Sequence, residues 1–238
     1  MKDISFAKDC TSNEQNINKI QDFYNDPVLF SYCNNSTIVD ALKDLIGTPS
    51  SNLVAFHTML INKCPDNGKL SSRHPLHQDS QPCPIQPYDF VACAWTAMQK
   101  INRENGCLSV IPGTHKGPVL SHSYPKWEGG VNKLFLGITD FDPAVPLTHL
   151  EMEAGDTVIF HPSLIHGSGA NRTKGFRKSI SCHYFNADYA KIIPSEQTTP
   201  EKVATEFVGM YKDRVIKQGF DQSLKIDLTE IVRFRCRP

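Results

Sequence analysis

Two short segments carry side chains that could bind one metal ion together. In His77-Gln78-Asp79, positions 77 and 79 point to the same side of an extended chain, so an imidazole and a carboxylate can face one ion. His166 can add a second imidazole from a distant strand. Two histidines and one carboxylate on one face leave coordination positions open, and this is the ligand set of non-haem Fe(II) oxygenases. The spacing predicts an iron site with room for a bidentate co-substrate and dioxygen.

Two residues that follow His166 suit the co-substrate that such a site needs. Arg177 begins an expected strand, and a guanidinium binds a carboxylate bidentately and stays charged when desolvated. Ser168 can donate a hydroxyl hydrogen bond to the same group. The pair therefore indicates the distal carboxylate of 2-oxoglutarate. Taken singly, each feature has a simpler explanation: a surface contact within His-x-Asp, a surface ion pair for Arg177 and a turn for Ser168.

The remaining reactive side chains form no competing motif. The other seven histidines are expected to be structural, with His122 and His183 the best candidates for contacts to the metal ligands. A Ser/His/Asp hydrolase would need a G-x-S-x-G elbow, which the sequence lacks. The eight cysteines include no C-x-x-C pair and no nucleophile motif, so we expect reduced, mostly buried thiols.

Hydropathy periodicity predicts the elements that must position these side chains. Helices are expected at 14–24, 35–47 and 199–218. Strands are expected at 53–62, 90–98, 107–111, 147–152, 156–160, 177–185 and 225–236. In the 177–185 strand, the side chains of one face are all polar: Arg177, Ser179, Ser181 and His183. A packed core would disfavour such a face, so the pattern favours a ligand cavity.

Many short strands joined by Gly and Pro turns predict a mainly β fold, an antiparallel sandwich or jelly roll with flanking α-helices. The 238 residues are expected to form one domain, with a helical part at 1–50, a catalytic β-core at 53–190 and a C-terminal helix and strand at 199–238. Equal numbers of basic and acidic residues, 25 each, argue against a nucleic-acid partner. No apolar run approaches the roughly 18 residues of a membrane span.

Longer stretches of the sequence resemble the phytanoyl-CoA dioxygenase family. They include CAWTAM at 93–98, YPKWEGGVNK at 124–133 and LIHGSG at 164–169, and further matches lie at 105–108, 112–117, 175–178 and 180–183. The match is dense between Phe56 and His183 and thinner toward the C-terminus. The 124–133 stretch is specific to the peroxisomal acyl-CoA hydroxylase branch of the family.

The resemblance implies a double-stranded β-helix and an Fe(II)- and 2-oxoglutarate-dependent enzyme of fatty-acid α-oxidation. It would use O2 and ascorbate to hydroxylate C2 of a 3-methyl-branched acyl-CoA such as phytanoyl-CoA. His77, Asp79 and His166 match the family's iron ligands, and Arg177 joins them as a catalytic residue. The co-substrate-binding residues implied by the resemblance are Lys19, Met59, His77, Gln78, Asp79, Trp95, Ser168 and Arg177.

The sequence differs from the family at its N-terminus, where the family has a targeting peptide, an edge strand and a helix. The resemblance implies a peroxisomal location, yet no targeting signal is visible, which leaves the cytoplasm open. Two alternatives stay open: the same chemistry on another small substrate, or a non-catalytic binding protein. Several basic residues could meet CoA phosphates or belong to ordinary solvated surface: Lys116, Lys126, Lys133, Arg172, Lys174 and Lys178.

Overall fold

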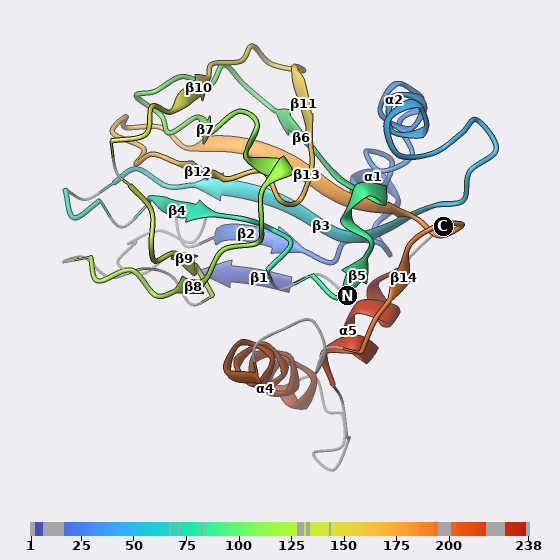
Figure 1. Ribbon diagram of the computed structural model, residues 1–238. Coiled ribbons are helices and arrows are strands. Elements are labelled where there is room, and N and C mark those ends of the chain that lie inside the picture. Colours follow the sequence, from blue (N-terminus) through green and yellow to red (C-terminus); the bar gives the residue numbers. More distant parts are fainter. Residues whose placement is uncertain are drawn as a thin grey trace.

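The computed structural model describes residues 3–6, 17–66, 68–70, 72–81, 83–127, 131, 134–142, 144–194, 201–217 and 227–236. Two antiparallel sheets lie face to face, with α2 on one side and α4 and α5 on another (Figure 1). This is the predicted mainly β jelly roll with flanking helices.

The larger sheet has six strands in the order β1-β2-β3-β13-β6-β11. Their bounds are Asp3–Phe6, Ile17–Gln21, Leu53–Lys63, Arg177–Asn186, Val91–Ala97 and Thr157–Phe160. The smaller sheet has the order β10-β7-β12-β4. Its strands are Thr148–Leu150, Leu108–Val110, His166–Ser168 and His74–His77.

Two short antiparallel strand pairs and six helical segments complete the described chain. The pairs are β14 (Lys191–Ile192) with β5 (Ile85–Gln86), and β8 (His122–Ser123) with β9 (Gly137–Ile138). The helices are α1 (Pro27–Phe30), α2 (Ser36–Ile46), η1 (Tyr88–Phe90), η2 (Thr114–Lys116), α4 (Glu201–Lys217) and α5 (Leu228–Arg235).

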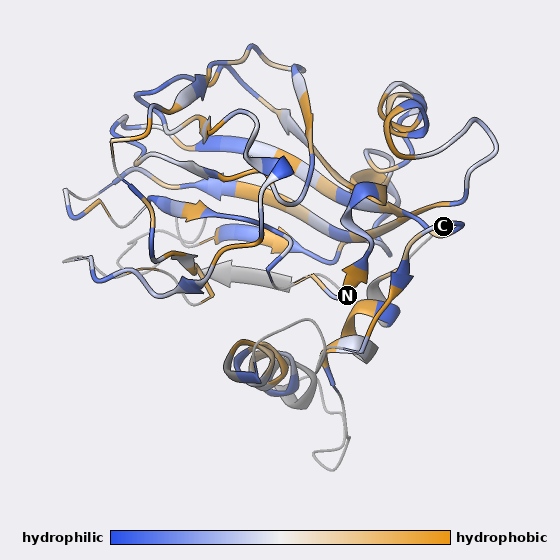
Figure 2. Cartoon of the chain, in the orientation of Figure 1, coloured by the Kyte–Doolittle hydropathy of each residue, from blue (hydrophilic) through white to orange (hydrophobic). Residues whose placement is uncertain are grey.

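Alternation along β13 separates a packed face from a polar one. Ile180, Cys182 and Tyr184 are buried in a core shared with α2, which contributes Ile38 and Leu42. Asn35 caps the start of this helix by accepting a hydrogen bond from the Ile38 amide. The strands of the large sheet and α2 each mix hydrophobic and hydrophilic residues (Figure 2). The opposite, polar face of β13 therefore points away from α2, toward the smaller sheet.

The C-terminal prediction of a strand at 225–236 is wrong, because residues 228–235 form the helix α5. Leu228, Ile231 and Val232 recur at spacings of three and four, which places all three on one helical face, and all are buried. Leu228 and Val232 pack against Val54, Phe185 and other residues at the end of the large sheet. The β-branched residues favoured a strand locally, but burial of this face determines the helix.

The N-terminal prediction of a helix at 14–24 is also wrong where the chain is described. Residues 17–21 form β2, which pairs with β3 and places Lys19 beside Ile61. The strand β1 then pairs with β2, so β3 is an inner strand of the large sheet. Pairing with a neighbouring strand satisfies the backbone here in place of a local helix.

The seven cysteines in the described part of the chain are all free thiols, and five of them are buried. Cys10 lies outside the described residues. Among the helices that the structure describes, none has both the length and the apolar character required to cross a bilayer.

Candidate active site

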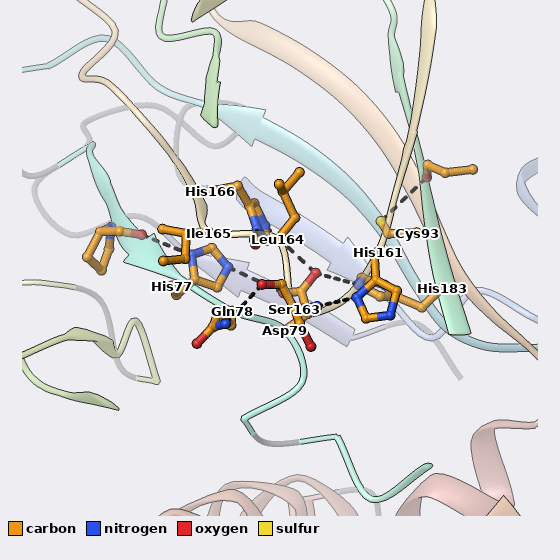
Figure 3. Close-up of polar contacts among 12 residues, drawn as sticks. His77, Gln78, Asp79, Cys93, His161, Ser163, Leu164, Ile165, His166 and His183 are labelled. Atoms are coloured by element: carbon orange, nitrogen blue, oxygen red, sulfur yellow. Dashed lines mark hydrogen bonds and ion pairs between the residues drawn. The ribbon is translucent and has the colours of Figure 1, made fainter. Parts of the chain in front are cut away.

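Two paired strands bring the histidines of the predicted metal site face to face. His77 ends β4 and His166 begins β12, and the antiparallel pairing of these strands makes the two residues direct partners. Asp79 lies in the turn after β4 (Figure 3). Its Oδ1 is 3.3 Å from His77 Nε2, and its Oδ2 is 3.7 Å from His166 Nε2. One ligand atom from each residue lies within 4.8 Å of the other two, which is close enough for one ion.

The backbone fixes which ring nitrogen each histidine offers to this cluster. His77 Nδ1 is 2.9 Å from the Pro75 carbonyl oxygen, and His166 Nδ1 is 2.9 Å from that of Leu164. A carbonyl only accepts hydrogen bonds, so both Nδ1 atoms carry the proton and both Nε2 lone pairs are free to bind a metal. Burial and the nearby His77 lower the pKa of His166 to about 4, so His166 is neutral at pH 7. Two imidazoles and a carboxylate fit a divalent ion.

Asp79 also has a partner on the opposite sheet. His183 on β13 places its Nε2 2.9 Å from Asp79 Oδ2. Burial would raise the pKa of Asp79, but the facing His166 and His183 and the hydrogen bond from His183 outweigh it and hold the pKa well below its ordinary value. Asp79 is therefore an ionised carboxylate that His183 orients.

The ring of His183 is itself held by residues of the large sheet. It stacks on His57 with 5.2 Å between ring centroids, and the two residues are partners in the β3–β13 pairing. Gln21 Nε2 on β2 lies 3.0 Å from His57 Nε2. Side chains from three neighbouring strands thus connect in sequence to Asp79, and they support the orientation of its carboxylate.

A second group, Asp79, Cys93 and His183, also brings ligand-type atoms within 4.8 Å of one another (Figure 3). A thiol must lose its proton to bind a metal. Burial raises the pKa of the Cys93 thiol, so it stays protonated at neutral pH. Burial would lower the pKa of His183, but Cys93 and Asp79 beside it raise the pKa well above its ordinary value. Since the thiol is neutral, the Asp79 carboxylate is the partner of His183, and the first cluster is the better metal site.

Beyond this cluster, two buried basic side chains lie side by side on the same face of the large sheet. Lys63 and Arg177 are only 5% and 2% exposed and are partners in the β3–β13 pairing. Burial lowers the pKa of Arg177 to about 10, so its guanidinium is charged at neutral pH, and burial and the neighbouring Arg177 hold the pKa of Lys63 well below its ordinary value. Within the described residues no carboxylate forms an ion pair with either. A buried cation without an anion is costly, so the site fits an anionic ligand.

The hydrogen bonds around these side chains leave donors free. Arg177 Nη1 donates to Ser179 Oγ at 2.7 Å, while Arg177 Nε and Ser181 Oγ are buried with no hydrogen-bond partner among the described residues. Lys63 Nζ donates to Ser168 Oγ at 2.6 Å and to the Gly169 carbonyl at 2.6 Å. Ser168 Oγ accepts from Lys63, so its own hydroxyl proton can be donated to a ligand. We call Lys63, Arg177, Ser179, Ser181 and His183 the polar inner face.

Strand register places the other residues expected near the co-substrate in this region. Met59 and Trp95 flank Ser181 in the β3–β13–β6 pairing, and the Arg177 guanidinium lies 5.3 Å from the centre of the Trp95 ring. Lys19 pairs with Ile61 one row further along, and its Nζ lies 5.5 Å from the centre of the Phe135 ring. The structure therefore places the Trp95 ring beside Arg177, and Met59 beside Ser181, which is on the same strand as Arg177.

Gln78 and His122 contribute to the positions of the ligands through the backbone. The Gln78 side chain donates to the carbonyls of Pro118 and Ser163 and accepts from the Leu120 amide, and it is almost fully buried. His122 Nε2 accepts a hydrogen bond of 2.9 Å from the Gln78 amide, between His77 and Asp79 in the sequence. The two histidines singled out as candidates for contacts to the ligands, His122 and His183, both lie against the cluster.

Lys63 was not among the predicted site residues. The strand was expected to end at Asn62, whereas β3 continues through Lys63. The same alternation that placed Arg177 on the polar side would have indicated Lys63, because a basic residue at the end of an apolar strand is in phase with Met59. His57 is in phase with the same residues and was likewise treated as a lone structural histidine.

Solved structures resemble this fold. The epimerase SnoN, described in complex with Fe3+, alpha ketoglutarate and nogalamycin RO, matches with a TM-score of 0.60 and 20% identity over 82% of this chain and 71% of that one. EctD from S. alaskensis, in its apoform, matches with a TM-score of 0.58 and 17% identity over 77% of this chain and 61% of that one. At these identities the likeness concerns the fold alone, a jelly roll.

Relatives at the sequence level are much closer. A probable phytanoyl-CoA dioxygenase of Caenorhabditis elegans is 59% identical over 239 residues, which cover all of this chain and 77% of the relative. The peroxisomal phytanoyl-CoA dioxygenase of Homo sapiens is 49% identical over 238 residues, all of this chain and 68% of the relative. The family model for phytanoyl-CoA dioxygenase matches residues 1–179. The chain is thus an enzyme and belongs to the phytanoyl-CoA dioxygenase family.

Proposed function

We propose that this enzyme is an Fe(II)- and 2-oxoglutarate-dependent dioxygenase that hydroxylates C2 of a 3-methyl-branched acyl-CoA, converting phytanoyl-CoA to 2-hydroxyphytanoyl-CoA. The observation that carries the proposal is the placement of two sites between the sheets. His77, Asp79 and His166 have ligand atoms within 4.8 Å of one another, and the buried Arg177 has a free Nε among the described residues. The cluster of His77, Asp79 and His166 suits iron, and the Arg177 guanidinium suits a carboxylate. The acyl-CoA substrate is supported by the names of the relatives.

His77, Asp79 and His166 hold the metal in this proposal, with neutral Nε2 atoms and an ionised carboxylate. When bound, Fe(II) and 2-oxoglutarate supply the oxidation: O2 and 2-oxoglutarate are consumed, succinate and CO2 leave, and one oxygen atom converts the C2–H bond to C2–OH. His183 holds Asp79 Oδ2 and keeps the carboxylate from rotating away from the two histidines. The carbonyls of Pro75 and Leu164 keep both imidazoles in the tautomer that can bind metal.

Arg177 binds the distal carboxylate of 2-oxoglutarate through its fork of N–H donors. Lys63 donates to Ser168 Oγ, and this leaves the Ser168 hydroxyl proton for the same carboxylate. The Trp95 ring covers the Arg177 guanidinium from the β6 side. Met59 lies on the opposite side of Ser181 from Trp95. The anion would neutralise the buried Arg177 guanidinium, so its binding stabilises a charge that is costly without it.

The CoA moiety carries phosphates, and exposed basic residues are candidates to meet them. Lys116, Lys126, Arg172, Lys174 and Lys178 are all exposed, and Lys133 lies outside the described residues. Lys178 has the opposite parity to Arg177 on β13 and so faces away from the polar inner face. We propose Lys126, in the stretch typical of the acyl-CoA branch, as a phosphate contact. Replacing Lys126 with Glu should raise the acyl-CoA KM, and an unchanged KM would remove Lys126 from the proposal.

We also propose that the reaction belongs to fatty-acid α-oxidation in the peroxisome, with ascorbate keeping the iron ferrous. The support is that rat and human relatives are named peroxisomal. Imaging of the tagged full-length gene product with a peroxisomal marker tests the location, and a diffuse cytoplasmic signal would contradict it. Omitting ascorbate should reduce the number of turnovers per enzyme, and an undiminished number would contradict its role.

Turnover of phytanoyl-CoA tests the main proposal. The purified protein is incubated with Fe(II), ascorbate, 2-oxoglutarate and phytanoyl-CoA, and mass spectrometry measures acyl-CoA that has gained one oxygen atom and succinate in equal amount. Matched amounts are expected. Succinate formed without oxidised acyl-CoA would indicate the same chemistry on another substrate, and soluble, iron-loaded protein without either product would overturn the proposal.

A further inference from the structure

A cavity opens beside His77 on the side of the molecule where α4 lies near β8 and β9 (Figure 1). The space in it that a water-sized molecule can reach is about 70 Å³. Its polar lining residues are His74, His77, Gln78, Gln81 and His122, all in or beside the segments that carry the metal-ligand candidates. None of the residues assigned to the carboxylate of the co-substrate lines it, so 2-oxoglutarate would not fill this space.

The outer part of the cavity is apolar and comes from two separate segments. Leu134 and Leu136 precede β9, and Val203 and Phe207 are four residues apart on α4, which places them on one face of the helix. We call these four side chains the apolar wall. Apolar lining with a few polar groups at one end is typical of a site for a largely hydrocarbon ligand. The polar end here holds a metal-ligand candidate, so the end of the ligand that reacts would lie at His77.

One phenol joins the two segments of the apolar wall. Tyr124 donates a hydrogen bond of 2.6 Å to Glu206 Oε1 on α4 and accepts one of 2.8 Å from the Leu134 amide. Leu134 has a φ of +64°, in the left-handed region that residues with a Cβ disfavour. The hydrogen bond from the Leu134 amide to the Tyr124 hydroxyl helps to hold this conformation. Tyr124 therefore fixes the spacing between Leu134 and Phe207, which determines the width of the cavity.

We propose that this cavity binds the methyl-branched acyl chain next to the thioester, that the apolar wall selects for the branch, and that Tyr124 is a positioning residue that sets its width. The proposal rests on the proposed function, because it names where that substrate binds. A methyl group at C3 lies one carbon from the oxidised C2, so it needs apolar space directly beside the metal ligands. The cavity between His77 and Phe207 provides that space.

Binding and turnover are measured separately to test the proposal. Isothermal titration of the metal-free protein with phytanoyl-CoA gives the Kd without turnover, and the succinate assay gives the acyl-CoA and 2-oxoglutarate KM values. In Phe207→Ala the lost apolar contact should weaken acyl-CoA binding about tenfold, with the 2-oxoglutarate KM unchanged. Leu136→Trp should narrow the cavity and lower kcat/KM for phytanoyl-CoA more than for straight-chain palmitoyl-CoA. Thr205→Ala, an exposed position on the same helix, is the matched control and should leave every value unchanged.

Tyr124→Phe removes the hydroxyl and keeps the ring. It should raise the phytanoyl-CoA KM roughly threefold to tenfold and reduce the preference for phytanoyl-CoA over palmitoyl-CoA, whereas a purely structural role would lower the melting temperature and leave the preference as it is.

The outcomes of the two assays are distinguishable. Folded Phe207→Ala and Leu136→Trp variants with wild-type Kd and wild-type chain preference would overturn the cavity assignment, even if the wild type hydroxylates phytanoyl-CoA. A wild type that binds phytanoyl-CoA without oxidising it, with binding weakened by Phe207→Ala, would overturn the proposed function and support the cavity. A wild type that does not bind the acyl-CoA would overturn both.

Discussion

On one side of His77 lies the polar inner face of the large sheet, and on the other lies the apolar wall under α4. The polar inner face is made of residues on neighbouring strands whose side chains are fully buried and whose positions follow from register. The apolar wall joins a loop near residue 135 to a helix that begins at Glu201, and Tyr124 links the two through its hydrogen bonds to Glu206 and to the Leu134 amide.

The difference suggests a division of tasks. Rigid strands hold groups whose geometry must be accurate, namely the two histidine ligands and the carboxylate-binding cation, whereas a loop and a helix can change in sequence without disturbing the sheets. If this is correct, substitutions in the polar inner face should change metal and co-substrate parameters. Substitutions in the apolar wall should change only acyl-CoA parameters.

The strongest test removes the charge at the centre of the metal cluster. Asp79→Ala should lower the rate of hydroxylation by roughly a hundredfold or more, because the carboxylate both binds the ion and offsets its charge. The product assay with phytanoyl-CoA measures it. Asp40→Ala, an exposed carboxylate on α2, is the control and should retain full activity. An active Asp79→Ala enzyme would show that the chemistry does not depend on this cluster.

A smaller effect on activity is expected from Arg177, at the end of the polar inner face that lies away from His183 and Asp79. Arg177→Gln should raise the 2-oxoglutarate KM by roughly thirtyfold to a hundredfold, since a buried charged hydrogen bond to the carboxylate is lost. The acyl-CoA Kd should stay at its wild-type value. Lys178→Gln is the matched control, because it is the next residue on the strand, is exposed and faces the other way. If both variants raise the KM equally, the effect comes from general surface charge and not from the site.

The sequence predicted the polar inner face better than the apolar wall, and the physical reason is periodicity. A strand has a period of two, so once Arg177 was placed, the directions of Ser179, Ser181 and His183 followed. The sequence indicated only that His77 and His166 lie on two distant segments that face one ion. Their direct strand partnership depends on which strands are neighbours, and alternation does not determine that.

The apolar wall depends on contacts that local patterns do not contain. The helix at 199–218 was predicted, but nothing in its sequence indicates that Val203 and Phe207 approach a loop some seventy residues earlier. The two errors, β2 predicted as a helix and α5 as a strand, have the same origin. Short amphipathic segments satisfy either period, and tertiary packing decides between them.

His183 tests whether support from the large sheet matters to the metal site. His183→Gln removes the contact to Asp79 Oδ2 and the stack on His57, so we expect affinity for Fe(II), or for Co(II) as a spectroscopic probe, to fall about tenfold. Titration of the metal-free protein measures this without turnover. His149→Gln, on β10, is the control. Equal affinity in wild type and His183→Gln would mean that Asp79 is oriented by its own turn alone.

The smallest expected effect concerns the stability of the metal-free protein below neutral pH. The pKa of His166 is about 4 in the folded chain, against an ordinary value near 6.5. The unfolded chain therefore binds more protons between these values, so stability falls as the pH falls through this window. Between pH 6 and pH 5 the loss from His166 is about 1 kcal/mol.

Urea unfolding of EDTA-treated protein at the two pH values measures this loss, and His166→Gln should show a pH dependence that is smaller by about the same 1 kcal/mol. His74 remains in both proteins, and burial, His77 and His166 all lower its pKa, so its contribution has the same sign. Because His166 is one of these causes, His166→Gln also reduces the His74 contribution, and the two changes act in the same direction. The raised pKa of His183 acts above this window, because below its unfolded pKa it is protonated in both states. An identical pH dependence in wild type and variant would mean that His166 becomes protonated in the folded protein over this pH range. The polar inner face would then be less closed to water than the buried contacts around Asp79 indicate.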